Sequence, residues 1–128
     1  MNKKRFLFTL AILALFCSAG LAVEIFNGQP NIKGAYNKLL NAINHLEKSK
    51  TEDAQKHVNQ AIVDLAAAKT FLEQSTNNKG TYRATAMKLC DEAAEALKAT
   101  PPDIVKANEV ANHALKEVNM AGKAGAHR

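Results

Sequence analysis

The chain has 128 residues, of which 47% are hydrophobic and 5% aromatic, with 17 Lys and Arg residues against 12 Asp and Glu. Three of the basic residues lie in residues 1–22, which contain no acid, so residues 23–128 carry a formal net charge of only +2. A nearly neutral surface with few aromatic side chains argues against binding to nucleic acid or to an anionic membrane. The length predicts a single domain.

Residues 1–22, MNKKRFLFTLAILALFCSAGLA, have the features of a secretory signal peptide. A basic start is followed by an apolar run from Phe6 to Phe16, which is too short to span a membrane, and then by small residues. We expect cleavage after Ala22. The large Phe16 before Cys17 argues against a lipoprotein signal. The mature chain is therefore predicted to be periplasmic or secreted from a bacterium, with no stable membrane insertion.

Residues 23–30 show no periodicity and are predicted to be a lead-in segment. The first helix is predicted over residues 31–48, because apolar residues recur there at gaps of four and three. They are Ile32, Tyr36, Leu39, Ile43 and Leu46. Ser49 with Glu52 has the form of a capping box, and Thr51 is the alternative cap for the next helix.

The second helix is predicted over residues 52–74, with a stripe formed by Ala54, Val58, Ala61, Leu65, Ala68 and Leu72. Residues 75–80 form a polar loop containing Asn and Gly, which ends this helix. The third helix is predicted over residues 81–99. Thr100 is expected to cap the fourth helix, with Pro101 in its first position. The fourth helix is expected to end near Met120 and to be followed by a flexible tail, residues 122–128.

Short connections make successive helices antiparallel neighbours, so the predicted fold is all-α, an up-down-up-down four-helix bundle over residues 31–121 built from two helical hairpins. Alanine supplies 19 of the 106 residues after the signal and occupies much of the apolar stripes. We therefore expect a slender core without room for a bulky cofactor.

Motifs typical of enzymes are missing from the sequence. There is no Gly-rich phosphate loop, no nucleophile elbow, no Glu-x-x-His on a helix and no C-x-x-C-H. We therefore expect no catalysis, no haem and no nucleotide.

Two histidines flank the first predicted turn. His45 precedes the turn and His57 follows it by a similar number of residues, so both should lie about 7–10 Å from it, level with each other on adjacent helices. Asp53 lies one turn before His57 and could complete a site for Cu(II), Ni(II) or Zn(II). However, His45 falls on the outer side of its helix. Two solvated histidines are the alternative, and helix rotation decides between them.

A second group consists of Met87, Cys90 and His113. Met87 and Cys90 are spaced to share a helix face, and His113 should lie at a similar height on the fourth helix, an arrangement that would suit Cu(I). The alternative is that the thioether and the thiol fill the core. Cys90 is the only cysteine after the signal, so it is either buried or pairs between two chains. The chain is accordingly expected to be a monomer or a weak homodimer.

The segments AYNKLLNAINH, residues 35–45, and KTEDAQKHVNQA, residues 50–61, resemble the small metal-binding protein family. The resemblance implies a periplasmic, histidine-bearing four-helix bundle that binds copper, nickel or zinc. His45 and His57 match the histidine pattern of the family, and His113 matches it loosely. The other histidines of the family are replaced here by Asn, Lys, Leu or Ala, which argues against loading of several metal ions.

The leading hypothesis is an exported, non-catalytic bundle that binds or buffers a divalent metal ion weakly in the periplasm. The alternative is a periplasmic protein-interaction, chaperone-like or stress module that binds an unidentified protein and no metal. Convergence of the two imidazoles would favour the first hypothesis, and divergence would favour the second.

Overall fold

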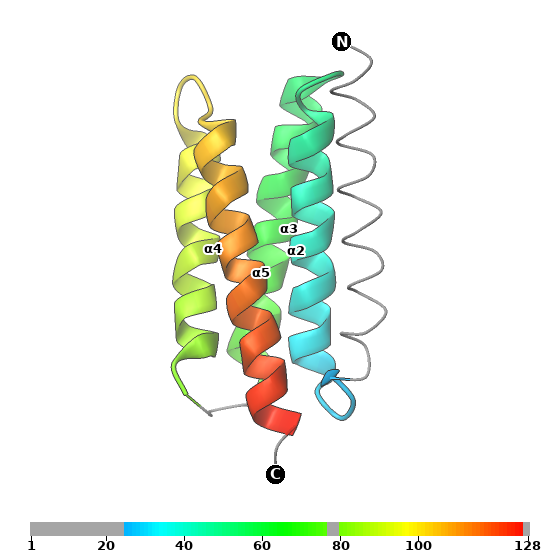
Figure 1. The fold of residues 1–128 in the computed structure, drawn as a ribbon. Helices are drawn as coiled ribbons and strands as arrows, with labels where there is room; N and C mark the ends of the chain where they lie inside the picture. The colour runs from blue at the N-terminus through cyan, green and yellow to red at the C-terminus, as the bar shows by residue number, and fades with distance from the viewer. Residues whose placement is uncertain (1–24, 77–79, 127–128) are drawn as a thin grey trace.

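The computed structural model describes residues 25–76 and 80–126. Within these residues the chain forms four helices: α2 (Pro30–Lys48), α3 (Ala54–Gln74), α4 (Tyr82–Lys98) and α5 (Ile104–Ala126). They run alternately up and down, and each packs against two neighbours in the ring α2, α3, α4, α5 (Figure 1). The prediction of an all-α four-helix bundle is confirmed. The predicted signal peptide lies outside the described residues.

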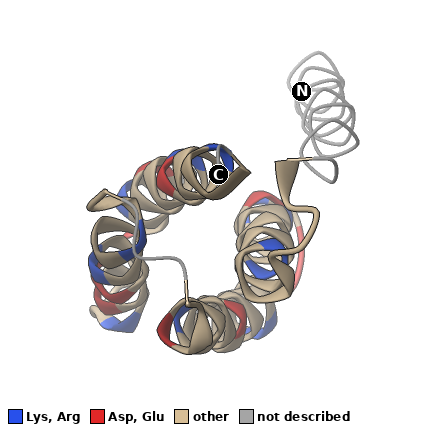
Figure 2. Cartoon of the chain, turned by 90° about the horizontal axis from the view of Figure 1, so that it is seen from below, with Lys and Arg blue, Asp and Glu red and all other residues tan. Residues whose placement is uncertain are grey.

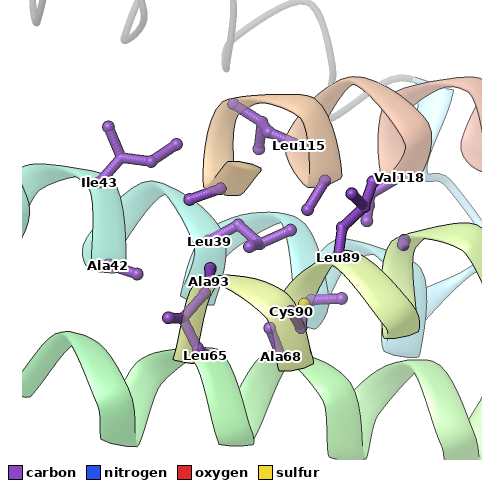
Figure 3. Close-up of a cluster of buried hydrophobic side chains, with 14 of the residues drawn as sticks. Leu39, Ala42, Ile43, Leu65, Ala68, Leu89, Cys90, Ala93, Leu115 and Val118 are labelled. Atoms are coloured by element: carbon purple, nitrogen blue, oxygen red, sulfur yellow. The ribbon is translucent and has the colours of Figure 1, made fainter. Parts of the chain in front are cut away.

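The core lies along the axis of the bundle and is formed by the predicted apolar stripes. Leu39, Leu65, Leu89 and Leu115, one from each helix, are buried there among alanines (Figure 3). When the bundle is viewed along its axis, Lys, Arg, Asp and Glu positions are distributed over all four helices of the ribbon (Figure 2). Of the charged side chains in the described residues, only Asp64 is buried. In these residues, no helix has the length and apolar character needed to cross a membrane.

The turn between α2 and α3 differs from the predicted capping. The Ser49 hydroxyl donates to the Leu46 carbonyl at 2.6 Å, and the Thr51 hydroxyl donates to the Lys48 carbonyl at 3.1 Å. Both hydroxyls therefore satisfy carbonyls at the end of α2, which have no partner inside the helix, and neither caps α3. The helix starts at Ala54 after Asp53, whose φ of 34° is left-handed. The predicted start at Glu52 was two residues too early.

The predicted cap of the last helix is also wrong. Asp103, not Thr100, precedes α5, and its Oδ1 accepts a hydrogen bond of 3.0 Å from the Lys106 amide. Pro101 is not in the helix. It precedes Pro102, and a residue before proline is disfavoured in the helical conformation, so the helix begins beyond both prolines.

Both ends of the described chain pack together at one end of the bundle (Figure 1). In the lead-in segment, the Phe26 ring is buried and lies 5.0 Å from the Tyr36 ring between centroids. The buried Gln29 side chain donates to the Gly122 carbonyl at 2.9 Å. Helix α5 continues to Ala126, so residues 122–126 are helical where the sequence predicted a tail, and Gly122 lies against Phe26 of the lead-in. Residues 127 and 128 lie outside the described part.

Candidate metal site

The α2–α3 hairpin brings the two predicted histidines together. The Nδ1 atoms of His45 and His57 lie 3.0 Å apart, and the centroids of the rings lie 5.2 Å apart. The two side chains are 26% and 12% exposed. The sequence left their convergence open because His45 fell on the outer side of its helix. The packing of α2 against α3 turns both imidazoles toward a common point beside the turn.

Carboxylates flank the imidazole pair on both sides. The Nε2 of His45 lies 3.8 Å from Oδ2 of Asp64, and the Nε2 of His57 lies 3.7 Å from Oε1 of Glu52. The Asp64 side chain is 6% exposed and the Glu52 side chain is 64% exposed. The four groups thus form a row, carboxylate, imidazole, imidazole, carboxylate, with one buried end and one solvated end.

Burial shifts the pKa values of His45 and Asp64 in this row. The pKa of His45 is lowered, chiefly because burial disfavours the imidazolium; His57 and Lys48 act in the same direction, and Asp64 opposes them. The pKa of Asp64 is raised by burial, against the effects of His45, Lys38 and a hydrogen bond from Gln60. A lowered pKa keeps the His45 imidazole neutral near pH 7, which is the form that binds metals.

The separation of the two Nδ1 atoms matches a pair of metal ligands. With metal–nitrogen bonds of about 2.0–2.1 Å, two nitrogens at a right angle are separated by about 2.8–3.0 Å, and two at the tetrahedral angle by about 3.3–3.4 Å. The observed 3.0 Å therefore fits adjacent positions of a square-planar or octahedral ion. The same distance also fits a hydrogen bond between the rings when one Nδ1 carries a proton.

Asp53 does not join the pair. Its side chain is exposed, makes no capping hydrogen bond and shows no ion pair with either imidazole in the described part of the chain. Its backbone carbonyl accepts a 3.1 Å hydrogen bond from the His57 amide. More generally, the described residues contain no group of three or more His, Cys, Asp and Glu side chains arranged to hold a metal ion. Of the predicted ligands Asp53, His45 and His57, the structure thus brings only the two imidazoles together.

Asp64 and Glu52 are the residues that sequence reasoning missed. Asp64 follows His57 by seven residues, two helical turns, and so lies on the same face of α3. The position of Asp64 directly before Leu65, a residue of the apolar stripe, was the sequence signal that this carboxylate lies near the core. Glu52 was assigned to capping, although its side chain faces His57.

Met87, Cys90 and His113 differ in their exposure and surroundings. Cys90 is buried in the core (Figure 3), where burial raises the pKa of the thiol to about 12, so the thiolate needed to bind copper is disfavoured. His113 is 55% exposed, and its Nε2 lies 3.4 Å from Glu117 on its own helix. Met87 is half-buried at the edge of the core. The thiol is thus core filler, as in the alternative reading.

Comparison with protein-family models, with curated proteins and with solved structures finds no match. The resemblance to the small metal-binding protein family rests on the two segments quoted above. The assignment of chemistry to this chain therefore depends on the geometry of the site.

Proposed function

We propose that the protein is an exported, non-catalytic four-helix bundle that binds a divalent metal ion, Cu(II), Ni(II) or Zn(II), weakly through His45 and His57. The observation that carries this proposal is the 3.0 Å separation of two Nδ1 atoms from different helices. Export is inferred from residues 1–22, and buffering of metal in the periplasm is the role that this location and a weak site favour together.

Weak binding follows from the ligand set. Two imidazoles leave at least two positions to water, whereas tight structural sites use four protein ligands. Imidazole nitrogen suits all three metals, and the usual order of affinity places Cu(II) above Ni(II) and Zn(II). The histidines are part-exposed beside a turn, so an ion can enter and leave without opening the core.

Calorimetric titration of the purified, tag-free protein with each metal in a non-coordinating buffer tests the proposal. We expect one ion per chain, with the highest affinity for Cu(II), and a higher melting temperature with metal. A ligand bound only by the folded state at 100 times its Kd stabilises by about 2.7 kcal/mol.

The matched variants locate the site. The double variant His45→Ala, His57→Ala should lose the heat and the melting shift, and His113→Ala, which removes an exposed histidine from α5, should retain both. The absence of both binding heat and a melting shift at millimolar metal would refute the proposal. It would favour the protein-interaction module instead. Loss of binding in His113→Ala would place the site elsewhere.

A further inference from the structure

One oxygen of the buried Asp64 carboxyl lacks the hydrogen-bond partner that the other buried polar side chains have. Ser49 donates to the Leu46 carbonyl and Gln29 donates to the Gly122 carbonyl. The Asp64 carboxyl receives a hydrogen bond from Gln60, but its Oδ2 has neither solvent contact nor a hydrogen-bond partner. The nearest ionisable group that it faces is the Nε2 of His45, at 3.8 Å.

Packing does not account for a carboxyl group at this position. Taking a carboxylate out of water is costly unless it is paired and fully hydrogen-bonded, and an isosteric or apolar side chain there is often neutral or stabilising. The raised pKa of Asp64 has the same origin, since burial disfavours its ionised form. A group that costs stability and faces a ligand imidazole is best explained by what it does to that imidazole.

The His45 ring lies between His57, at hydrogen-bond distance, and Asp64, at ion-pair distance. The ring from α2 reaches the same face of α3 at two places, with Nδ1 against His57 and Nε2 against Asp64. One imidazole nitrogen therefore faces the proposed metal position, and the other faces a buried carboxylate. In metal sites, a carboxylate on the outer nitrogen of a ligating histidine fixes its tautomer and raises its basicity.

The tautomers follow from these contacts. If His45 carried its proton on Nδ1, the lone pair of its Nε2 would face the carboxylate of Asp64, which is repulsive. If His45 carries its proton on Nε2, that N–H points to Asp64. The Nδ1 of His45 is then free to accept a hydrogen bond from the Nδ1–H of His57. Glu52 is largely exposed, so water screens the attraction between its carboxylate and a proton on the Nε2 of His57. The buried carboxylate therefore decides the arrangement.

We propose that Asp64 is a positioning residue that holds His45 in the Nε2–H tautomer, so that the Nδ1 lone pair is ready for a divalent cation shared with His57. This inference rests on the proposed function. It further implies that His57 exchanges tautomers on binding. Its proton leaves Nδ1 and is carried on Nε2, which faces Glu52, whereas the tautomer of His45 does not change.

Nitrogen NMR of the imidazoles tests this assignment without altering the protein. Long-range proton–nitrogen spectra of the nitrogen-15-labelled protein at neutral pH should show His45 as the Nε2–H tautomer before and after addition of Zn(II), which is diamagnetic. His57 should change from the Nδ1–H pattern to the Nε2–H pattern. A Nδ1–H tautomer for His45 in the metal-free protein would overturn the inference about Asp64. A lack of any change with Zn(II) would instead count against metal binding.

The variant Asp64→Asn provides the second test, because it keeps the shape and removes the carboxylate. We expect Cu(II) affinity to fall about 10- to 100-fold, the usual effect of losing such a carboxylate, while the metal-free melting temperature stays equal or rises. Asp91→Asn makes the same change on the surface of α4 and should leave affinity unchanged. Wild-type affinity in Asp64→Asn would refute the proposal. If that variant does not fold, the NMR tautomer of His45 still decides.

Discussion

Because Gly122 lies against Phe26, the effect of Gly122→Ala on stability should differ in sign between the wild-type protein and a Phe26→Ala variant. A Cβ atom at position 122 would overlap the Phe26 ring and approach the Ile25 side chain to 3.3 Å. Adding a methyl group to such a contact costs about 1–3 kcal/mol. Alanine in place of glycine within a helix contributes about 1 kcal/mol in the opposite direction. Gly122→Ala should therefore destabilise the protein by about 0–2 kcal/mol.

In a Phe26→Ala background the same substitution should be stabilising. Phe26→Ala alone is expected to cost about 3–5 kcal/mol, since it empties a buried ring site. With the ring gone, only the gain in helix propensity remains, so adding Gly122→Ala should recover up to about 1 kcal/mol. The two substitutions should thus be coupled by about 1–3 kcal/mol, which lies within the range of about 0.5–3 kcal/mol typical of residues in direct contact.

Urea denaturation followed by circular dichroism at 222 nm measures the free energy of unfolding of the wild type, the two single variants and the double variant. One kcal/mol corresponds to about 4–8 °C in melting temperature for a domain of this size, so thermal melts provide an independent check. If Gly122→Ala stabilises the wild-type chain as much as the Phe26→Ala chain, Phe26 does not occupy the end of the bundle, and the docking of the lead-in segment is refuted.

Two further predictions concern titratable groups. The pKa of His45 is lowered in the folded protein, so the unfolded chain takes up this proton first as the pH falls through about 6.5. The free energy of unfolding should therefore decrease as the pH falls below that value, and His45→Ala should reduce this pH dependence in denaturation experiments. A slope that His45→Ala leaves intact would contradict the burial argument. Cys90 is buried and has a thiol pKa of about 12, so in the protein of residues 23–128 it should react with a disulfide reagent at pH 8 only on unfolding. The same protein should run only as a monomer on a non-reducing gel, and rapid labelling of the folded protein would contradict the burial of Cys90.

The arrangement of the helices could be predicted because it depends on periodicity. The stripe through Leu39 and Leu46 specifies which side of α2 is buried, and short connections leave antiparallel neighbours as the simple solution. The turns were predicted less well, because a hydroxyl in a short turn can serve either helix. Ser49 satisfies the end of α2 rather than the start of α3, and sequence spacing does not distinguish the two uses.

The site could be predicted only in part. Counting residues from the turn placed His45 and His57 at one level, since rise per residue is fixed in a helix. Their convergence depends on the rotation of α2 about its axis, which is set by packing along its whole length. Asp64 was missed for a related reason. It is a single charged residue at the edge of an apolar stripe, and only the structure shows that the ring of His45 lies beside it.

The imidazole pair joins residues that are only 12 positions apart in the chain. Closing so short a loop costs little chain entropy, so these side chains can meet as soon as α2 and α3 pair, before the second hairpin docks. A metal ion bound there would stabilise the first hairpin and have less effect on local unfolding of α4 and α5. In hydrogen exchange, added metal should therefore protect the amides of α2 and α3 more than those of α4 and α5. The site would then stabilise one hairpin locally rather than the whole bundle.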